Sequence, residues 1–169
     1  MGGAGARQLG DALGSNASVK ELNLDGNSSG AAGTTQLADA RRINTSVEQL
    51  ELQCNSIGEA GATQLADALR TNTSVKVLDL EGNSIGAGAT QLADALRTNT
   101  SVEELSLYDN SIGEAGATQL AHALPPNTTL APLCPYGNST RDAGATHLPP
   151  RPAPHTPAQE PDPARTYPR

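Results

Sequence analysis

The amino-acid sequence predicts a right-handed α/β solenoid, in which a parallel sheet lines the concave side and helices line the convex side. Three observations support this fold class. A unit of 27 or 28 residues recurs, each unit holds an alternating apolar segment followed by an amphipathic one, and the 169-residue chain has no Phe or Trp. A solenoid tolerates such a composition because each repeat packs only on its neighbours.

The repeat is visible as nearly identical sequence segments. The segment GATQLADALRTNTSV begins at Gly61 and again at Gly88, and a drifted copy, GATQLAHALPPNTTL, begins at Gly116. Pairs of leucines two residues apart recur with it, at Leu22/Leu24, Leu50/Leu52, Leu78/Leu80 and Leu105/Leu107. Successive pairs are 28, 28 and 27 residues apart, within the range of about 20–29 for repeats that carry one strand each.

Each leucine pair lies in a predicted strand. The run V-K-V-L-D-L at 75–80 alternates as a strand with one buried face should. An asparagine follows each pair at a fixed offset, and we expect its side chain to be buried with its amide bonded to the backbone of the next coil. These ladder asparagines are Asn27, Asn55, Asn83, Asn110 and Asn138.

The second half of each unit predicts a helix. In the clearest copy, apolar residues fall at i, i+3, i+4 and i+7 on one face, namely Ala62, Leu65, Ala66 and Leu69. The next unit lacks one residue after Gly86. We expect the connection between strand and helix to absorb this deletion, so that the strand at 77–80 and the helix at 90–96 keep the register of their neighbours.

The repeats divide the chain into three parts. Residues 1–130 form the array, with one half repeat and four full repeats, and residues 131–148 form a degenerate fifth repeat interrupted by prolines. Residues 149–169 form a Pro-rich tail that we expect to be disordered. All 12 prolines lie at or after Pro125. The first full repeat is also irregular, because Ser29 stands where the others have Ile57, Ile85 and Ile112.

The combination of LDLEGNSIG with GATQLADALRTNTSV resembles the ribonuclease-inhibitor-like class of leucine-rich repeats. Within that class, its residue pattern is most similar to the repeat arrays of NOD-like receptors. The resemblance covers about residues 5–148. It implies a segment of a leucine-rich-repeat horseshoe that binds a protein through its concave face and the edges of that face.

The side chains that flank the strand leucines are predicted to point away from the core. Six of the twelve are acidic and none is basic, and Val77 and Tyr108 are candidate anchors because aromatic residues are enriched at binding hot spots. The predicted concave face comprises Glu21, Asn23, Asp25, Gln49, Glu51, Gln53, Val77, Asp79, Glu81, Glu104, Ser106 and Tyr108.

Charge narrows the class of partner. Residues 1–130 hold seven Lys or Arg against fifteen Asp or Glu, so phosphate backbones would be repelled and a basic protein is the expected partner. No apolar run approaches the ~18 residues of a membrane span. The start of the chain has no apolar signal region, and we expect a cytoplasmic protein without membrane, nucleic-acid or small-molecule ligands.

Catalysis is not expected. The glycine-rich turns are not followed by the GK[ST] of a phosphate-binding loop, the two cysteines have no metal-ligand spacing, and the histidines have no acid or nucleophile in register. We therefore expect no cofactor and no metal. Two alternatives to a binding module stay open: a GTPase-activating protein of the Ran type, and a fragment or remnant of a longer receptor array without autonomous function.

Overall fold

A computed structural model describes residues 2–131 and 137–138. Most of the predicted fifth repeat and the whole Pro-rich tail lie outside the described residues. Helix α1 (Gly3–Ser15) comes first and has no strand before it among them. Four strand-and-helix units follow: β1 (Glu21–Asn23) with α2 (Gly30–Ile43), β2 (Gln49–Glu51) with α3 (Gly58–Leu69), β3 (Val77–Asp79) with η1 (Gly86–Gly88) and α4 (Ala89–Leu96), and β4 (Glu104–Ser106) with α5 (Gly113–Ala123).

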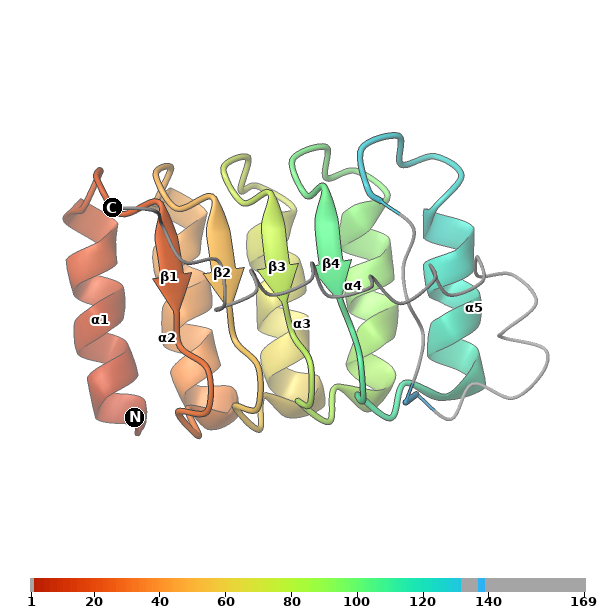
Figure 1. Cartoon of the computed structure of the whole chain (residues 1–169), viewed down its shortest axis with the longest axis horizontal. Coiled ribbons are helices and arrows are strands. Elements are labelled where there is room, and N and C mark those ends of the chain that lie inside the picture. The colour runs from red at the N-terminus through yellow and green to blue at the C-terminus, as the bar shows by residue number, and fades with distance from the viewer. Residues whose placement is uncertain (1, 132–136, 139–169) are drawn as a thin grey trace, which may run out of the picture.

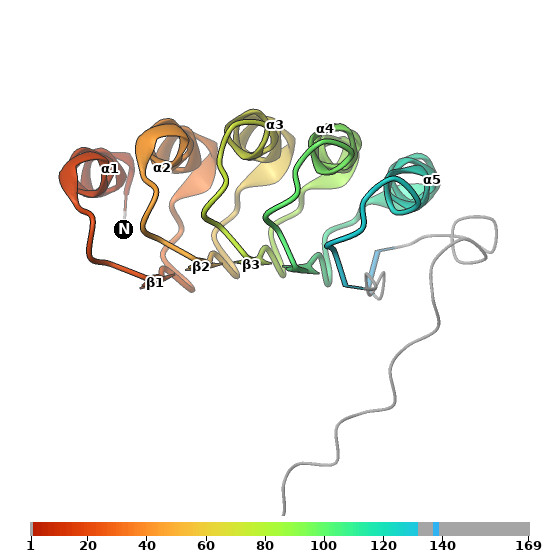
Figure 2. The ribbon, with the colours of Figure 1, turned by 90° about the horizontal axis from the view of Figure 1, so that it is seen from above.

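The four strands form one parallel sheet in the order β1-β2-β3-β4 (Figure 1). The register places each leucine beside its counterpart, with Leu22 opposite Leu50, Leu50 opposite Leu78, and Leu78 opposite Leu105. The helices stand behind the sheet in a second layer, and seen from above they follow the outer side of a gentle arc (Figure 2). The predicted fold class, an α/β leucine-rich-repeat solenoid, is confirmed.

One apolar core runs between the two layers along the whole array. Apart from the half-buried Leu22, the strand leucines are buried, and so is the inner face of the helices. Leu78 and Leu80 are at most 1% exposed, and Ala62 and Leu65 at most 2%. Repeat thus packs on repeat without a large aromatic side chain, as expected for a quasi-one-dimensional fold.

The deletion after Gly86 is absorbed where the helix begins. The segment Gly86–Gly88 forms a 3₁₀ turn, and α4 starts at Ala89 with eight residues, against twelve in α3. Leu92 and Leu96 remain fully buried, and Val77 still pairs with Glu104. The expectation that strand and helix keep their register is confirmed, because a tighter helical turn takes fewer residues per turn.

The asparagines after the strands lie inside the array and bond adjacent coils. Asn83 is fully buried. Its amide nitrogen donates to the carbonyls of Leu52 (2.8 Å), Leu80 (2.9 Å) and Glu81 (3.0 Å). Its Oδ1 accepts the backbone N–H groups of Asn55 (2.9 Å) and Ile57 (3.3 Å). Each such side chain satisfies backbone groups that the short strands leave unpaired.

A second asparagine ladder lies at the other end of the repeat, in the turn between helix and strand. Its members are Asn16, Asn44, Asn72, Asn99 and Asn127. Asn99, for example, donates to the carbonyls of Leu69 (2.8 Å) and Asn72 (3.1 Å) and accepts from the N–H groups of Ser101 (3.0 Å) and Val102 (2.9 Å). The two ladders clamp neighbouring repeats at both ends of each strand.

Ser29 is a weak point of the first full repeat. It is 5% exposed, and its hydroxyl has no hydrogen-bond partner among the described residues. The equivalent isoleucine, Ile57, packs so closely on Gly61 that a Cβ there would lie 2.6 Å from Ile57 Cγ2. Gly33 stands at the same offset from Ser29, and a Cβ there would lie 3.0 Å from Ser29 Cβ, so position 29 faces a glycine just as Ile57 does.

Replacing Ser29 with isoleucine should therefore stabilise the chain. The change removes a buried unpaired hydroxyl, worth about 1–3 kcal/mol, and buries additional apolar surface. Thermal unfolding followed by circular dichroism should show a higher Tm, and Ser29→Ala should give a smaller rise because it fills no space. A fall in Tm for Ser29→Ile would mean that the site has no room for the longer side chain.

Candidate protein-binding face

The strand register arranges the predicted concave residues in three rows that cross the sheet. The first row follows from the pairing of Glu21 with Gln49, Gln49 with Val77, and Val77 with Glu104. The second row is Asn23, Glu51, Asp79 and Ser106. The third, directly after the strands, follows the repeat offsets as Asp25, Gln53, Glu81 and Tyr108. Because adjacent strands lie about 4.8 Å apart, side chains of one row are close neighbours.

These twelve side chains differ in exposure. Tyr108 is 46% exposed and is the large apolar side chain that the described surface presents to solvent. Val77 is only half-buried among the polar members of its row, and Gln49, Glu51, Gln53, Asp79 and Ser106 are half-buried as well. Tyr108 is therefore the stronger of the two anchor candidates.

Amide side chains hold two of the six acids in place. Glu51 accepts hydrogen bonds from Asn23 on one neighbouring strand and from Gln49 on its own strand, the latter at 2.9 Å. Asp79 accepts one from Gln53 at 2.8 Å and one from the backbone N–H of Glu81 at 3.0 Å. These two carboxylates therefore have fewer free acceptor sites for a partner.

The other four concave acids are exposed. Within residues 2–131 and 137–138 their carboxylates make no hydrogen bond or ion pair, which leaves them open to a ligand. They are Glu21, Asp25, Glu81 and Glu104. Glu81 and Tyr108 are neighbours in the third row, just after β3 and β4, so an exposed carboxylate lies beside the exposed tyrosine.

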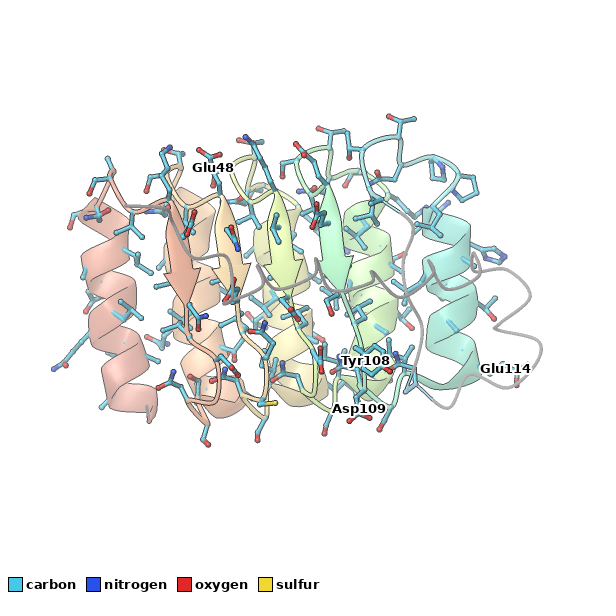
Figure 3. All side chains as sticks on the ribbon, in the orientation of Figure 1. Glu48, Tyr108, Asp109 and Glu114 are labelled. Carbon is cyan, nitrogen blue, oxygen red and sulfur yellow. The ribbon has the colours of Figure 1, made fainter. Side chains whose placement is uncertain are left out.

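Residues at the upper edge of the sheet, just before each strand, form a row of alternating charge that the sequence analysis missed. Glu48 Oε1 contacts Lys20 Nζ at 2.9 Å, and Glu48 Oε2 contacts Lys76 Nζ at 3.0 Å. Figure 3 shows Glu48 at this edge, beside the start of β2. The hydrogen bonds from Lys20 and then Lys76 lower the pKa of Glu48, and the bond to Glu48 raises the pKa of Lys76.

This row predicts a pH dependence. The lowered pKa of Glu48 gives a stabilising contribution that is present above the ordinary carboxyl pKa and is lost as pH falls through the folded-state value. The raised pKa of Lys76 gives one that is present below the ordinary lysine pKa and is lost as pH rises through its folded-state value. Both groups are exposed, so the effect on stability should be small and sensitive to salt.

The measurement is an NMR titration of Lys76. Glu48→Gln should lower the pKa of Lys76 toward its ordinary value, because it removes the largest cause of the upward shift. Glu103→Gln should lower it less, because Glu103 acts on Lys76 only through its charge. An unchanged pKa of Lys76 in Glu48→Gln would contradict the ion-pair row.

The opposite edge of the sheet has a different character. Figure 3 places Tyr108 and Asp109 together below the end of β4, with Glu114 at the start of α5. Asp109 is exposed, and its φ of +50° belongs to the sharp turn after the strand. The exposed ring at this edge is thus flanked by acids on both sides, Glu81 along its row and Asp109 along the chain.

Other kinds of site find little support in the described part of the chain. No group of three or more His, Cys, Asp or Glu there is placed to hold a metal ion. An interior void lined by Leu50, Leu65, Leu69 and neighbouring side chains measures about 10 Å³, too small for a ligand. None of the described helices combines the length and the apolar character needed to cross a membrane.

Comparisons with known proteins agree with this architecture. Residues 44–66, 71–88 and 98–121 match the leucine-rich-repeat family model. Among solved structures, the chain is similar to the actin-binding site 2 of leiomodin-1, with 20% identity and a TM-score of 0.66 over 78% of this chain and 77% of that one. It is also similar to the C-terminal domain of a Caenorhabditis elegans tropomodulin, with 16% identity and a TM-score of 0.66 over 86% and 87%.

A search of curated proteins finds no match. At 16–20% identity the likeness to the two solved structures concerns the fold. This likeness places the array among leucine-rich-repeat solenoids. The role of the concave face depends on its own side chains.

Proposed function

We propose that this array is a non-catalytic protein-binding module, which holds a basic segment of a partner protein against its concave face. The observation that carries the proposal is that this face of the sheet bears four exposed carboxylates that are unpaired within the described residues, one of them beside an exposed tyrosine. Charge of one sign on a surface steers an oppositely charged partner toward it and fixes its register. Tyr108 supplies the kind of anchor that dominates binding energy at interfaces.

The partner segment should contact β3 and β4 most closely. Glu104 lies in β4, and Glu81 and Tyr108 directly follow β3 and β4, while Glu51 of β2 and Asp79 of β3 are already bonded to amides. A single extended or helical segment with two or three Lys or Arg residues is wide enough to reach all three side chains, because adjacent strands are about 4.8 Å apart.

The resemblance of the repeats to NOD-like-receptor arrays belongs to the same proposal, and so does a cytoplasmic location. An array of this kind in the cytoplasm would meet its partner in a reducing compartment, where the exposed thiol of Cys54 would stay free. The two solved structures support only the fold, and one of them is an actin-binding site of leiomodin-1.

The test is affinity capture of partners from a cell extract on the immobilised chain, at low and at high salt. Basic proteins should be enriched in the low-salt eluate and should be released as salt rises, because exposed charges are screened. Captured proteins of average charge that stay bound at high salt would contradict the proposal.

Actin is a second, defined probe. Purified actin should be mixed with the chain and with Tyr108→Ala, and binding measured by co-sedimentation and by titration of monomers. Binding that Tyr108→Ala weakens at least about tenfold, or about 1.4 kcal/mol, would extend the concave-face proposal to actin. Binding that this substitution leaves intact would place the contact elsewhere on the array.

A further inference from the structure

Every asparagine of the second ladder begins an acceptor sequence for N-linked glycosylation. Asn-x-Ser/Thr, the acceptor sequence for N-linked glycans, occurs seven times in the chain, and every one of the seven asparagines belongs to one of the two ladders. Five belong to the turn between helix and strand, at Asn16, Asn44, Asn72, Asn99 and Asn127. The residues that a glycosylating enzyme would recognise are therefore the residues that join the repeats.

Inside the array these amides are buried and fully used. Asn99 is 5% exposed, and its nitrogen donates to the carbonyls of Leu69 and Asn72 at 2.8 and 3.1 Å. Asn44 is 2% exposed and donates to the carbonyls of Leu13 and Asn16 at 2.8 and 2.9 Å. An amide nitrogen has only two hydrogens to donate, so no donor is left over at either nitrogen.

Glycosylation changes this atom directly. The sugar C1 is transferred from a lipid-linked pyrophosphate: a bond forms between Nδ2 and C1, the bond from C1 to the pyrophosphate oxygen breaks, and one proton leaves Nδ2. One donor is lost, and a bulky, hydrated group is attached where a backbone carbonyl has to lie. The carbonyl deprived of its donor stays buried without a partner, which is itself unfavourable.

The first member of the ladder differs from the interior ones. Asn16 is half-exposed, and among the described residues its nitrogen donates only to the Ser18 hydroxyl, at 3.3 Å. Its Oδ1 still accepts from the N–H groups of Ser18 and Val19. A glycan on Asn16 would displace no backbone hydrogen bond described at its nitrogen.

We infer that folding of this array and N-glycosylation of its interior ladder exclude each other, and that Asn16 is a position at which a glycan and the fold are compatible. The consequence is that the array folds only where oligosaccharide transfer does not precede folding. This inference is independent of what the concave face binds.

Two matched full-length chains test it. In one, the Asn16 sequence is kept and the other six are removed by changing their third residue to alanine; in the other, only the Asn99 sequence is kept. The two chains differ only at Ser18 and Ser101, and both keep every ladder asparagine. Each is made in eukaryotic cells with an added secretion signal, with and without an inhibitor of oligosaccharide transfer.

Glycosylated and unglycosylated forms of each chain are then purified in urea, refolded by dilution and melted by circular dichroism. The glycosylated Asn16 chain should refold and melt cooperatively at the Tm of its unglycosylated form. The glycosylated Asn99 chain should either never accumulate or fail to show a cooperative melt, while its unglycosylated form refolds. A glycosylated Asn99 chain with the Tm of the unglycosylated form overturns the exclusion, and loss of folding in the glycosylated Asn16 chain overturns the distinction between the two positions.

Discussion

Replacing Asn83 with alanine should strongly destabilise the array, because its side chain is fully buried and makes five hydrogen bonds to backbone groups. The substitution leaves buried carbonyls and N–H groups of adjacent coils without partners, and each such group costs about 1–3 kcal/mol. These penalties do not simply add up, so we expect the free energy of unfolding to fall by at least about 3 kcal/mol rather than by the full sum. That is a large part of the ~5–15 kcal/mol of a typical domain. Urea and thermal unfolding followed by circular dichroism measure it.

Asn27→Ala is the matched control at the exposed end of the same ladder. Asn27 is half-exposed and donates to the carbonyls of Leu24 and Asp25, within its own repeat. Water can replace part of these bonds, so its loss of stability should be clearly smaller. Asn138→Ala should also cost less than Asn83→Ala, because its repeat is degenerate and interrupted by prolines. Equal shifts for all three variants would contradict the view that the interior ladder holds the coils together.

The same melts address whether the chain is a remnant of a longer array. A cooperative transition of the unmodified chain is the expected result for a solenoid whose repeats are clamped at both ends of each strand. A broad, non-cooperative transition would favour the remnant and would weaken the proposal of an autonomous binding module.

The fold could be predicted from the sequence because its information is repeated. A leucine pair at a constant offset, followed by an amphipathic segment, predicts a strand, a helix and their packing in every unit. Where one unit is irregular, the neighbouring units still show which of its positions are buried. Even the deletion after Gly86 could be placed in the turn before the helix, because the buried positions on both sides of it were already known from other repeats.

The second ladder was missed although its signal was equally regular. Asn72 and Asn99 each begin the sequence NTS in the turn before a strand, at a register as constant as that of the first ladder. A polar residue at a fixed register in a solenoid has the same physical reason in either turn: unpaired backbone groups of the neighbouring coil have to be satisfied. The same reasoning that predicted the first ladder would have found the second.

Details of the concave face depend on side-chain geometry across strands, which strand alternation does not supply. Alternation assigns Asp79 and Glu81 to the same face, yet Asp79 accepts hydrogen bonds from Gln53 and from the backbone. Lys20 and Lys76 lie next to this face, but each stands two residues before a strand leucine, so alternation by two does not assign it to this face. Fewer carboxylates of this face are therefore free to contact a partner than the number of its acidic residues indicates.

These contacts decide which acids should be reversed to test the binding face. Asp79→Lys would break bonds that order the sheet, and on the convex side Asp67 is half-buried and lies 3.6 Å from Arg70. Glu81 and Glu104 are exposed and unpaired within the described residues, and so are Asp11 and Asp39 on the outer helices. The two pairs give double reversals to lysine that leave the fold intact.

With a basic partner from the capture experiment, the concave double variant Glu81→Lys and Glu104→Lys should lose at least about tenfold in affinity at low salt, or about 1.4 kcal/mol. The attraction becomes repulsion at the site of contact. The convex variant Asp11→Lys and Asp39→Lys changes net charge by the same amount, but it acts across more than a Debye length of about 8–10 Å. Its affinity should change by less than about twofold. Equal losses in the two variants, measured by titration calorimetry at several salt concentrations, would show that a diffuse acidic field and not the concave face attracts the partner.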